Sequence, residues 1–463
     1  MTASFHLTGI FFSLIINLYS SNFFSAYCCR YSVKGGIHMH SDTFALKGNI
    51  CYSRNLSEIS ISDHAYLICE NGICAGIFQT LPEKYKGIPC RDCGDSLIIP
   101  GMSDLHVHAP QYSFRSIGMD LELLEWLDTM AFPEESRYAD LEYARAAYSI
   151  FASDLKKSAT TRASIFGTLH VPATEILMEL LEETGLKAFV GKVNMDRNSV
   201  PSLQEETAVS AKDTKEWIER SLTRFHNIKP ILTPRFIPSC TDALMTELGR
   251  LQKQYHLPVQ SHLSENKGEI AWVRELCPEA DFYGDAYDRF GLFGGEDCPT
   301  LMAHCVHCTD EEIARMKERG VYAVHCSQSN SNLSSGIAPV RRYLKEGLHT
   351  GLGSDIAGGT SLSMLRAMAD SIQTSKLYWR LIDNSASPLT IEEVFYMATA
   401  GGGSFFGKVG SFEKGYEFDA VILDDTSLPC PRPLSSRERL ERIIYLSDER
   451  HISGKYVAGA KIF

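Results

Sequence analysis

Positive charge is in short supply in this sequence of 463 residues. Lysine and arginine together number 45, against 57 aspartates and glutamates, so the formal net charge at pH 7 is −12. A surface with this charge repels polyanions, which excludes a nucleic-acid duplex as an expected partner. Charged residues make up 22% and hydrophobic residues 44% of the chain, as in ordinary globular proteins with a large core.

Two kinds of motif are also missing. No glycine-rich phosphate-binding fingerprint follows any strand-like segment, which argues against a nucleotide cofactor. The 14 cysteines include two Cys-x-x-Cys pairs, Cys90/Cys93 and Cys305/Cys308, but neither is followed by a matching second pair. In a chain of this length, the cysteines favour reduced thiols over a disulfide framework or a structural zinc site.

Residues 1–38 stand apart, because no aspartate, glutamate, lysine or arginine occurs between Phe5 and Tyr27. This resembles a targeting or anchor segment, but no lysine or arginine precedes the apolar run, and Phe24 is bulky where a cleavage site takes a small residue. Met39 then opens a segment typical of a cytosolic start. We expect an extension of uncertain role that the working protein lacks, and a cytoplasmic protein with no membrane partner. Targeting and a structural role are the alternatives.

Both ends of the remaining chain are rich in short strand-like segments. Asn71-Gly72 lies between two of them and is a strong signal for a hairpin turn. Two β-rich ends that flank a different middle predict one small β-sandwich domain built from both termini, residues 39–99 and 405–463. The strand-like segments are 44–46, 65–69, 73–78, 418–423 and 455–462.

Residues 100–404 alternate strand-like segments with amphipathic helical ones. The helical segments, such as 141–157, 242–255 and 311–318, place apolar residues at i, i+3 and i+4. Eight strands that alternate with helices predict an α/β fold, a closed (β/α)8 barrel of the TIM type, with a doubly wound open sheet as the alternative. The predicted strands are 103–108, 160–166, 187–194, 228–235, 258–263, 300–305, 321–325 and 349–354.

Reactive side chains recur at the C-terminal ends of these strands, where such barrels carry their active sites. His106 and His108 are alternate residues of one strand, so their imidazoles point to the same side. Together with His262 and Asp355 they form a ligand set that suits Zn²⁺ or Fe²⁺ and leaves a position for water. The metal would lower the pKa of that water towards neutrality.

Two further residues at strand ends suit proton transfer. Glu265 lies three positions after His262, so it can reach the water and act as a general acid/base. His304 ends another strand and either orients the water, polarises the substrate or fills the barrel mouth. We therefore expect Glu265, Asp355 and His304 to be the catalytic residues.

Several segments resemble the amidohydrolase superfamily of metal-dependent hydrolases, and within it the branch that deaminates guanine. His-x-His and the histidine of the fifth strand are general to the superfamily, whereas His-Ala-Pro-Gln-Tyr-Ser-Phe (108–114) and Thr-Pro-Arg-Phe (233–236) are more specific. The resemblance covers the chain from about residue 44 to its end. The other segments that carry it are 100–107, 123–127, 189–193, 260–266, 302–304 and 351–359.

The resemblance implies zinc-dependent hydrolysis of guanine to xanthine and ammonia, a step of purine catabolism, with one metal ion per chain. It also implies that Gln111, Arg235 and Phe236 hold the purine: Arg235 can donate to a ring carbonyl, and Phe236 offers an apolar face. His108, His262, Glu265 and Asp355 complete the expected substrate-binding set. We expect guanine and water to be the small-molecule partners, and the protein to be a homodimer.

Other functions stay open on the sequence alone. A binuclear amidohydrolase that acts on cyclic amides would need a bridging modified lysine, for which Lys192 on the third strand is the candidate; Lys229 lies at the wrong end of the fourth. A deaminase or chlorohydrolase acting on another purine, a pterin or a triazine is a second alternative. A silent scaffold is the third, although it should have lost a ligand or the acid, and none is missing.

Overall fold

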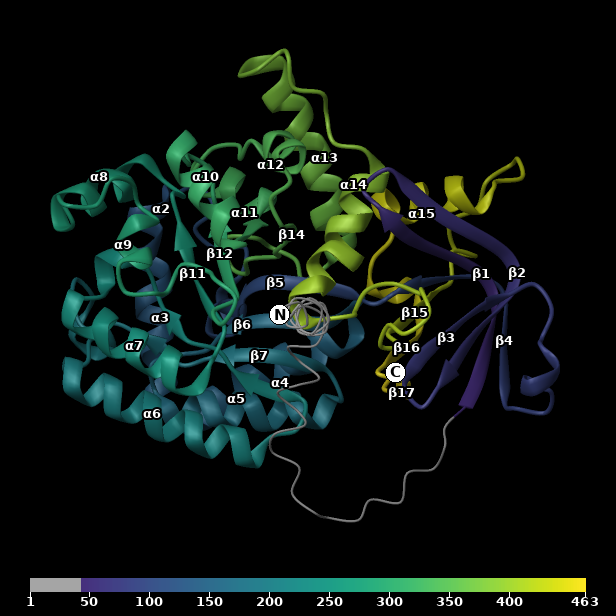
Figure 1. Ribbon diagram of the computed structural model, residues 1–463, viewed down its shortest axis with the longest axis horizontal. Helices are drawn as coiled ribbons and strands as arrows, with labels where there is room; N and C mark the ends of the chain where they lie inside the picture. The colour runs from purple at the N-terminus through teal and green to yellow at the C-terminus, as the bar shows by residue number, and fades with distance from the viewer. Residues whose placement is uncertain (1–42) are drawn as a thin grey trace, which may run out of the picture.

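The computed structural model describes residues 43–463 (Figure 1). The predictions made for residues 1–38 and for a start at Met39 lie outside this range, as do the first four residues of the predicted β-rich domain. Among the helices of residues 43–463, none combines the length and the apolar character needed to cross a membrane.

A closed barrel of eight parallel strands occupies the middle of the chain, which confirms the predicted fold class. Two four-stranded sheets, β5-β6-β7-β9 and β11-β12-β13-β14, are joined at both edges. Leu232 bridges to Val259 on one side, and the backbone N–H of Asp355 donates to the carbonyl of His106 (2.8 Å) on the other. The strands are β5 (Met102–His108), β6 (Thr160–Phe166), β7 (Lys187–Gly191), β9 (Ile228–Pro230), β11 (Val259–Leu263), β12 (Thr300–His304), β13 (Tyr322–His325) and β14 (Thr350–Leu352).

The fourth barrel strand is shorter than the sequence predicts. Instead of one strand over 228–235, the chain forms β9 and then a two-residue strand, β10 (Thr233–Pro234), which pairs with β8 (Val193–Asn194). Pro230 and Pro234 have no backbone N–H and cannot donate to a neighbouring strand, so a regular ladder does not continue through them. The interruption leaves Arg235 and Phe236 on irregular backbone at the rim of the barrel.

Helices surround the barrel (Figure 1). The longest are amphipathic: α4 buries Ala144, Tyr148 and Phe151 on one face, and the Asp140 side chain caps its start by accepting from two backbone N–H groups. The α-helices of residues 43–463 are α2 (Leu123–Trp126), α3 (Phe132–Ser136), α4 (Leu141–Lys157), α5 (Val171–Thr184), α6 (Thr207–Arg224), α7 (Asp242–Tyr255), α8 (Lys267–Leu276), α9 (Asp285–Asp288), α10 (Asp310–Arg319), α11 (Ser327–Asn332), α12 (Val340–Glu346), α13 (Met364–Leu381), α14 (Ile391–Tyr396) and α15 (Ser436–Leu446).

Strands from both ends of the described chain form a second sheet beside the barrel, with purple and yellow strands side by side in Figure 1. Its order is β17-β16-β15-β4-β1-β2-β3. Asn71 and Gly72 have φ of 54° and 78°, as a tight turn between β2 and β3 requires, so the predicted hairpin is confirmed. The strands are β1 (Thr43–Asn55), β2 (Glu58–Glu70), β3 (Ile73–Phe78), β4 (Cys90–Pro100), β15 (Ala420–Leu423), β16 (Ile452–Val457) and β17 (Ala460–Lys461).

This sheet curls on itself. Phe44 of β1 stacks on Tyr456 of β16 with ring centroids 5.4 Å apart, although β4 and β15 lie between those strands in the sheet. Phe418 packs edge-on against Phe44 at 5.3 Å. One continuous sheet therefore encloses its core in the manner of a sandwich. We propose that it forms a domain of its own, with limits at residues 39–99 and 405–463.

Buried polar contacts fasten the curled sheet to the barrel at the start of β6. The Arg162 guanidinium donates to both carboxylate oxygens of Asp419 (2.7 and 2.9 Å) and to Glu417 (2.9 Å). Lys455 is fully buried, and its Nζ donates to the carbonyl oxygens of Leu155, Ser158 and Thr160 (3.2, 2.9 and 2.9 Å). Burial lowers the pKa of Lys455 to about 7. This junction lies at the opposite end of β6 from the C-terminal rim of the barrel.

Candidate metal and active site

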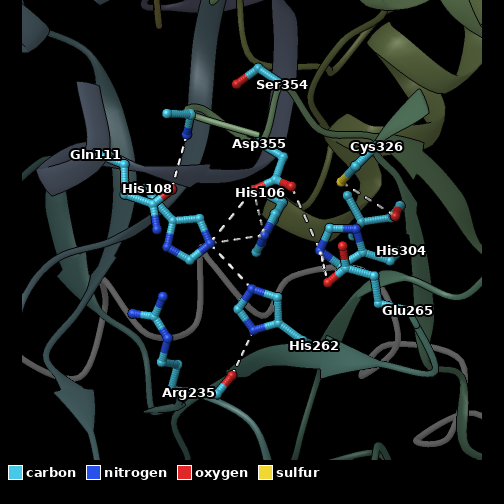
Figure 2. Close-up of polar contacts among 12 residues, drawn as sticks. His106, His108, Gln111, Arg235, His262, Glu265, His304, Cys326, Ser354 and Asp355 are labelled. Atoms are coloured by element: carbon cyan, nitrogen blue, oxygen red, sulfur yellow. Dashed lines mark hydrogen bonds and ion pairs between the residues drawn. The ribbon is translucent and has the colours of Figure 1, made fainter. Parts of the chain in front are cut away.

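Three histidine side chains from two strands converge at the C-terminal rim of the barrel (Figure 2). His106 and His108 are alternate residues of β5 and point to the same side, as predicted. Nε2 of His108 lies 3.2 Å from Nε2 of His106 and 3.2 Å from Nε2 of His262 on β11. Burial lowers the pKa values of all three imidazoles, which keeps them in the neutral form that binds metal ions.

Asp355 brings a carboxylate to the same point. It follows β14, and its Oδ1 lies 3.2 Å from Nε2 of His106 and 3.6 Å from Nε2 of His108. Two groups of three residues offer ligand atoms within 4.8 Å of one another: His106, His108 and His262, and His106, His304 and Asp355. Neutral imidazole nitrogens around one carboxylate are the donor set that zinc or ferrous iron prefers, so the residues present fit such an ion.

Backbone partners orient these ligand atoms. Nδ1 of His262 donates to the carbonyl oxygen of Arg235 (2.6 Å), which leaves Nε2 as the unprotonated nitrogen that faces the cluster. Asp104, a buried residue of β5 that sequence reasoning missed, accepts from the backbone N–H of Ser354 (2.9 Å). It thereby holds the end of β14 against β5 beside Asp355. The isolated aspartate in a buried strand carried no pattern that would have revealed this contact.

Glu265 lies beside the histidines, at the end of β11. Its Oε2 is 3.3 Å from Nε2 of His304, and its Oε1 accepts a hydrogen bond from the hydroxyl of Ser335 (2.9 Å). Burial raises the pKa of Glu265 to about 7. A carboxyl group with a pKa near neutrality can both take and give a proton, so its environment suits general acid/base work.

His304 lies between two carboxylates. Its Nδ1 donates to Oδ1 of Asn330 (2.8 Å), and its Nε2 faces Glu265 and Oδ2 of Asp355 (3.7 Å). Burial alone would lower the pKa of His304, but the two carboxylates outweigh it and the pKa is raised. His304 has φ of 74° and Cys305 has φ of 49°, a left-handed backbone that is uncommon for non-glycine residues. Asn330 was missed because nothing in its local sequence marks it as a partner of His304.

A cavity of about 440 Å³, mouth included, opens beside this cluster. Gln111, Arg235 and Phe236, predicted to hold a ring, all line it. Leu123, Trp126, Leu127 and Leu333 add apolar walls. The predicted catalytic and substrate-binding residues therefore lie together around one space. Figure 2 shows Gln111 and Arg235 on one side of the histidine cluster, opposite Glu265 and His304, and we call the Gln111 and Arg235 side the far end of the cavity.

Two alternatives lose support in this geometry. Lys192, the candidate bridging lysine, is fully buried, and its Nζ donates to Glu205 (2.5 Å) and Ser210 (3.3 Å), so it is already paired with other side chains. Lys229 donates to the carbonyl of Phe225. The Cys90/Cys93 and Cys305/Cys308 pairs are thiols rather than disulfides, as predicted, and are absent from both groups of metal-ligand type in residues 43–463.

Comparison with known proteins agrees with the fold and the cluster. A model described as the amidohydrolase family matches residues 97–462. The guanine deaminase of Dictyostelium discoideum is 40% identical over 441 residues, covering 90% of this chain and 97% of its own; that of Mus musculus is 39% identical over 379 residues, covering 79% and 82%. A structure of guanine deaminase from C. acetobutylicum "with bound guanine in the active site" is 47% identical, with a TM-score of 0.89 over 91% of this chain and 100% of that one.

The chain therefore belongs to the amidohydrolase family. Within that family it belongs with the guanine deaminases.

Proposed function

We propose that this protein hydrolyses guanine to xanthine and ammonia. The observation that carries the proposal is the position of Glu265, whose carboxyl group borders both the histidine cluster and the cavity that Gln111 and Arg235 line. The relatives named above, with their guanine deaminase activity and the guanine bound in one of them, support the same substrate.

The proposed metal ligands are His106, His108, His262 and Asp355, which would hold one Zn²⁺ per chain, with Fe²⁺ as the other ion that fits this donor set. Such an ion supplies a Lewis acid that makes water a nucleophile near neutral pH. Two of these ligands are held in place by hydrogen bonds. The His262 side chain donates to the Arg235 carbonyl oxygen, and the backbone N–H of Asp355 donates to the His106 carbonyl oxygen.

The far end of the cavity suits a purine ring. Arg235 and Gln111 both have N–H groups that can donate to a ring carbonyl or ring nitrogen, and Phe236 and Trp126 offer apolar faces. Held there, guanine would present C2 and its amino group to the cluster.

Glu265 moves the protons in this proposal. It takes a proton from the water that attacks C2 and delivers it to the ring nitrogen next to C2. Asp355 assists the transfer of the second proton to the amino group, and His304 holds the Glu265 carboxylate in place. The C2–N bond then breaks and ammonia leaves, so one water is consumed and xanthine and ammonia are formed.

We propose that the protein acts in the cytoplasm, where the reaction would serve purine catabolism. We also propose that it is a homodimer. The decisive experiment adds guanine to the purified protein and follows the ultraviolet absorbance change together with ammonia release. Stoichiometric xanthine and ammonia are expected. No release of ammonia by the metal-loaded protein would rule the proposal out.

A further inference from the structure

A buried carboxylate behind the cavity joins the two side chains that face its far end. Glu135 of α3 is 2% exposed. Its Oε1 accepts from Nε2 of Gln111 (2.8 Å), and its Oε2 accepts from Nη1 of Arg235 (2.5 Å). Neither the metal cluster nor the proton path described above uses this residue.

The contact fixes the orientation of the Gln111 amide. The backbone N–H of Ala357 donates to its Oε1 (3.0 Å), and a backbone N–H can only donate. The carboxylate of Glu135 can only accept, so it must face the NH₂ group. The two partners together exclude the flipped amide, and one N–H of Gln111 remains for a ring in the cavity.

The same helix also holds Arg235. Phe132 and Glu135 are three residues apart in α3 and so lie on one face of it. The guanidinium carbon of Arg235 lies 5.2 Å from the centre of the Phe132 ring, while Glu135 binds one end of the guanidinium. The remaining N–H groups of Arg235 are thereby held in a fixed plane.

Charge is the second consequence. The Arg235 and Glu135 side chains are 4% and 3% exposed, so their charges are weakly screened by solvent. An arginine alone at the end of a buried cavity would attract anions. Paired with Glu135, it becomes a neutral unit that still offers hydrogen-bond donors. A site built in this way prefers a neutral ring with a carbonyl group over an anionic one.

We propose that Glu135 is the positioning residue that makes this site selective for neutral oxopurines over anionic ones. It aims the N–H groups of Gln111 and Arg235 and neutralises the charge of Arg235. The inference rests on the proposed function, because it names the kind of ring that the same cavity selects.

Two non-reacting purines test it. Near neutral pH, urate carries one negative charge and hypoxanthine none, and neither has an amino group at C2. Their inhibition constants against guanine are measured for the unmodified protein and for Glu135→Gln. We expect the ratio of the urate constant to the hypoxanthine constant to fall by about tenfold or more in Glu135→Gln, since the charge of Arg235 is no longer compensated.

The matched control is Glu134→Gln on the same helix. Glu134 binds Tyr143 and Arg137 and does not line the cavity. Glu134→Gln should leave the ratio of the two inhibition constants within about twofold of its original value, because sites without shared partners act nearly independently. If Glu135 had only a structural role, Glu135→Gln would weaken the binding of urate and hypoxanthine by the same factor. An unchanged ratio in Glu135→Gln therefore overturns the proposal.

Two precautions keep the outcomes distinct. If Glu135→Gln does not fold, Glu135→Asp keeps the charge and must keep the ratio; a large gain in urate binding by that variant would overturn the proposal. Calorimetric titration of both purines gives the same ratio without turnover. Absence of ammonia release from the unmodified protein contradicts the proposed function, whereas normal turnover with an unchanged ratio contradicts only the role of Glu135.

Discussion

Ser354 is tied to Asp104 by two hydrogen bonds, one from its backbone N–H to Oδ1 (2.9 Å) and one from its hydroxyl to Oδ2 (2.5 Å). Asp104 belongs to the first strand of the barrel, and Ser354 follows the last one by two residues. Asp104 precedes His106 by two positions and Ser354 precedes Asp355 by one, so a single buried contact sets the distance between two proposed ligands. Burial raises the pKa of Asp104 to about 7, despite the bonds from Ser354.

The first prediction concerns this contact. Asp104→Ala should weaken metal binding by roughly 10–100-fold, as loss of a residue that orients ligands commonly does. Competition with a chelator of known affinity measures the effect. Ser103→Ala is the control, because the hydroxyl of Ser103 is buried without a partner in residues 43–463. Equal metal affinity in the two variants would show that Asp104 does not orient the ligands.

The second prediction concerns the ligands themselves. His262→Ala should lose most of the metal, because its Nε2 lies 3.2 Å from that of His108 and it supplies one of the three imidazoles of the first ligand group. Elemental analysis of the purified proteins measures the metal content, which should be roughly one ion per chain in the unmodified protein. His349→Ala, a change at an exposed histidine, should retain the ion. Full occupancy in His262→Ala would refute the ligand set.

The third prediction separates proton transfer from binding. Glu265→Gln preserves shape but removes the base, so kcat should fall by about 10²–10⁴-fold, the usual contribution of a general acid/base. The variant should keep its metal and still bind xanthine. Glu275→Gln on the exposed side of α8 serves as the control. Near-normal turnover in Glu265→Gln would mean that another group moves the protons, with Asp355 the first to examine.

The fourth prediction concerns Arg235, which faces the ring rather than the attacking water. Arg235→Ala should mainly raise KM, because it removes a contact made in the ground state and the transition state alike. Steady-state kinetics with guanine would reveal the split between KM and kcat. A fall in kcat with an unchanged KM would place Arg235 in the chemical step instead.

The fifth prediction concerns the junction between sheet and barrel. Lys455→Met removes the donor that three buried carbonyl oxygens share, although that of Leu155 still accepts from Ser158, and this should cost about 2–5 kcal/mol of unfolding free energy. Denaturant titration measures this loss. Lys461→Met, at an exposed position of β17, should cost little. A loss no greater than that of Lys461→Met would show that the junction does not depend on Lys455.

The same substitution predicts a pH dependence. Between pH of about 7 and 10.5 the unfolded chain holds the Lys455 proton and the folded chain does not, so the stability of the unmodified protein rises with pH in that window. Below pH 7 both states are protonated and Lys455 contributes no slope. The stability difference between the unmodified protein and Lys455→Met should therefore grow from neutral to alkaline pH.

Local patterns in the sequence predict much of this fold. The limits of β6, α4 and α7 coincide with the predicted ones, because each segment has an unbroken apolar period that packing reinforces. The histidines and Asp355 were predictable because parallel strands bring their ends together. Glu135 was not, since its partners lie 24 and 100 positions away and a glutamate in the first turn of a short helix is usually solvated.

The backbone bond from Asp355 to His106 joins the last barrel strand to the first. The proposed ligands come from the ends of the first, fifth and eighth strands and together span more than 240 residues of the chain. No intermediate that has yet to dock its final strand can offer the full set of donors. Ion uptake during refolding should therefore report completion of the ring, and a chain cut off before Thr350 would keep the three imidazoles but lack Asp355, so it should bind the ion more weakly than the full chain.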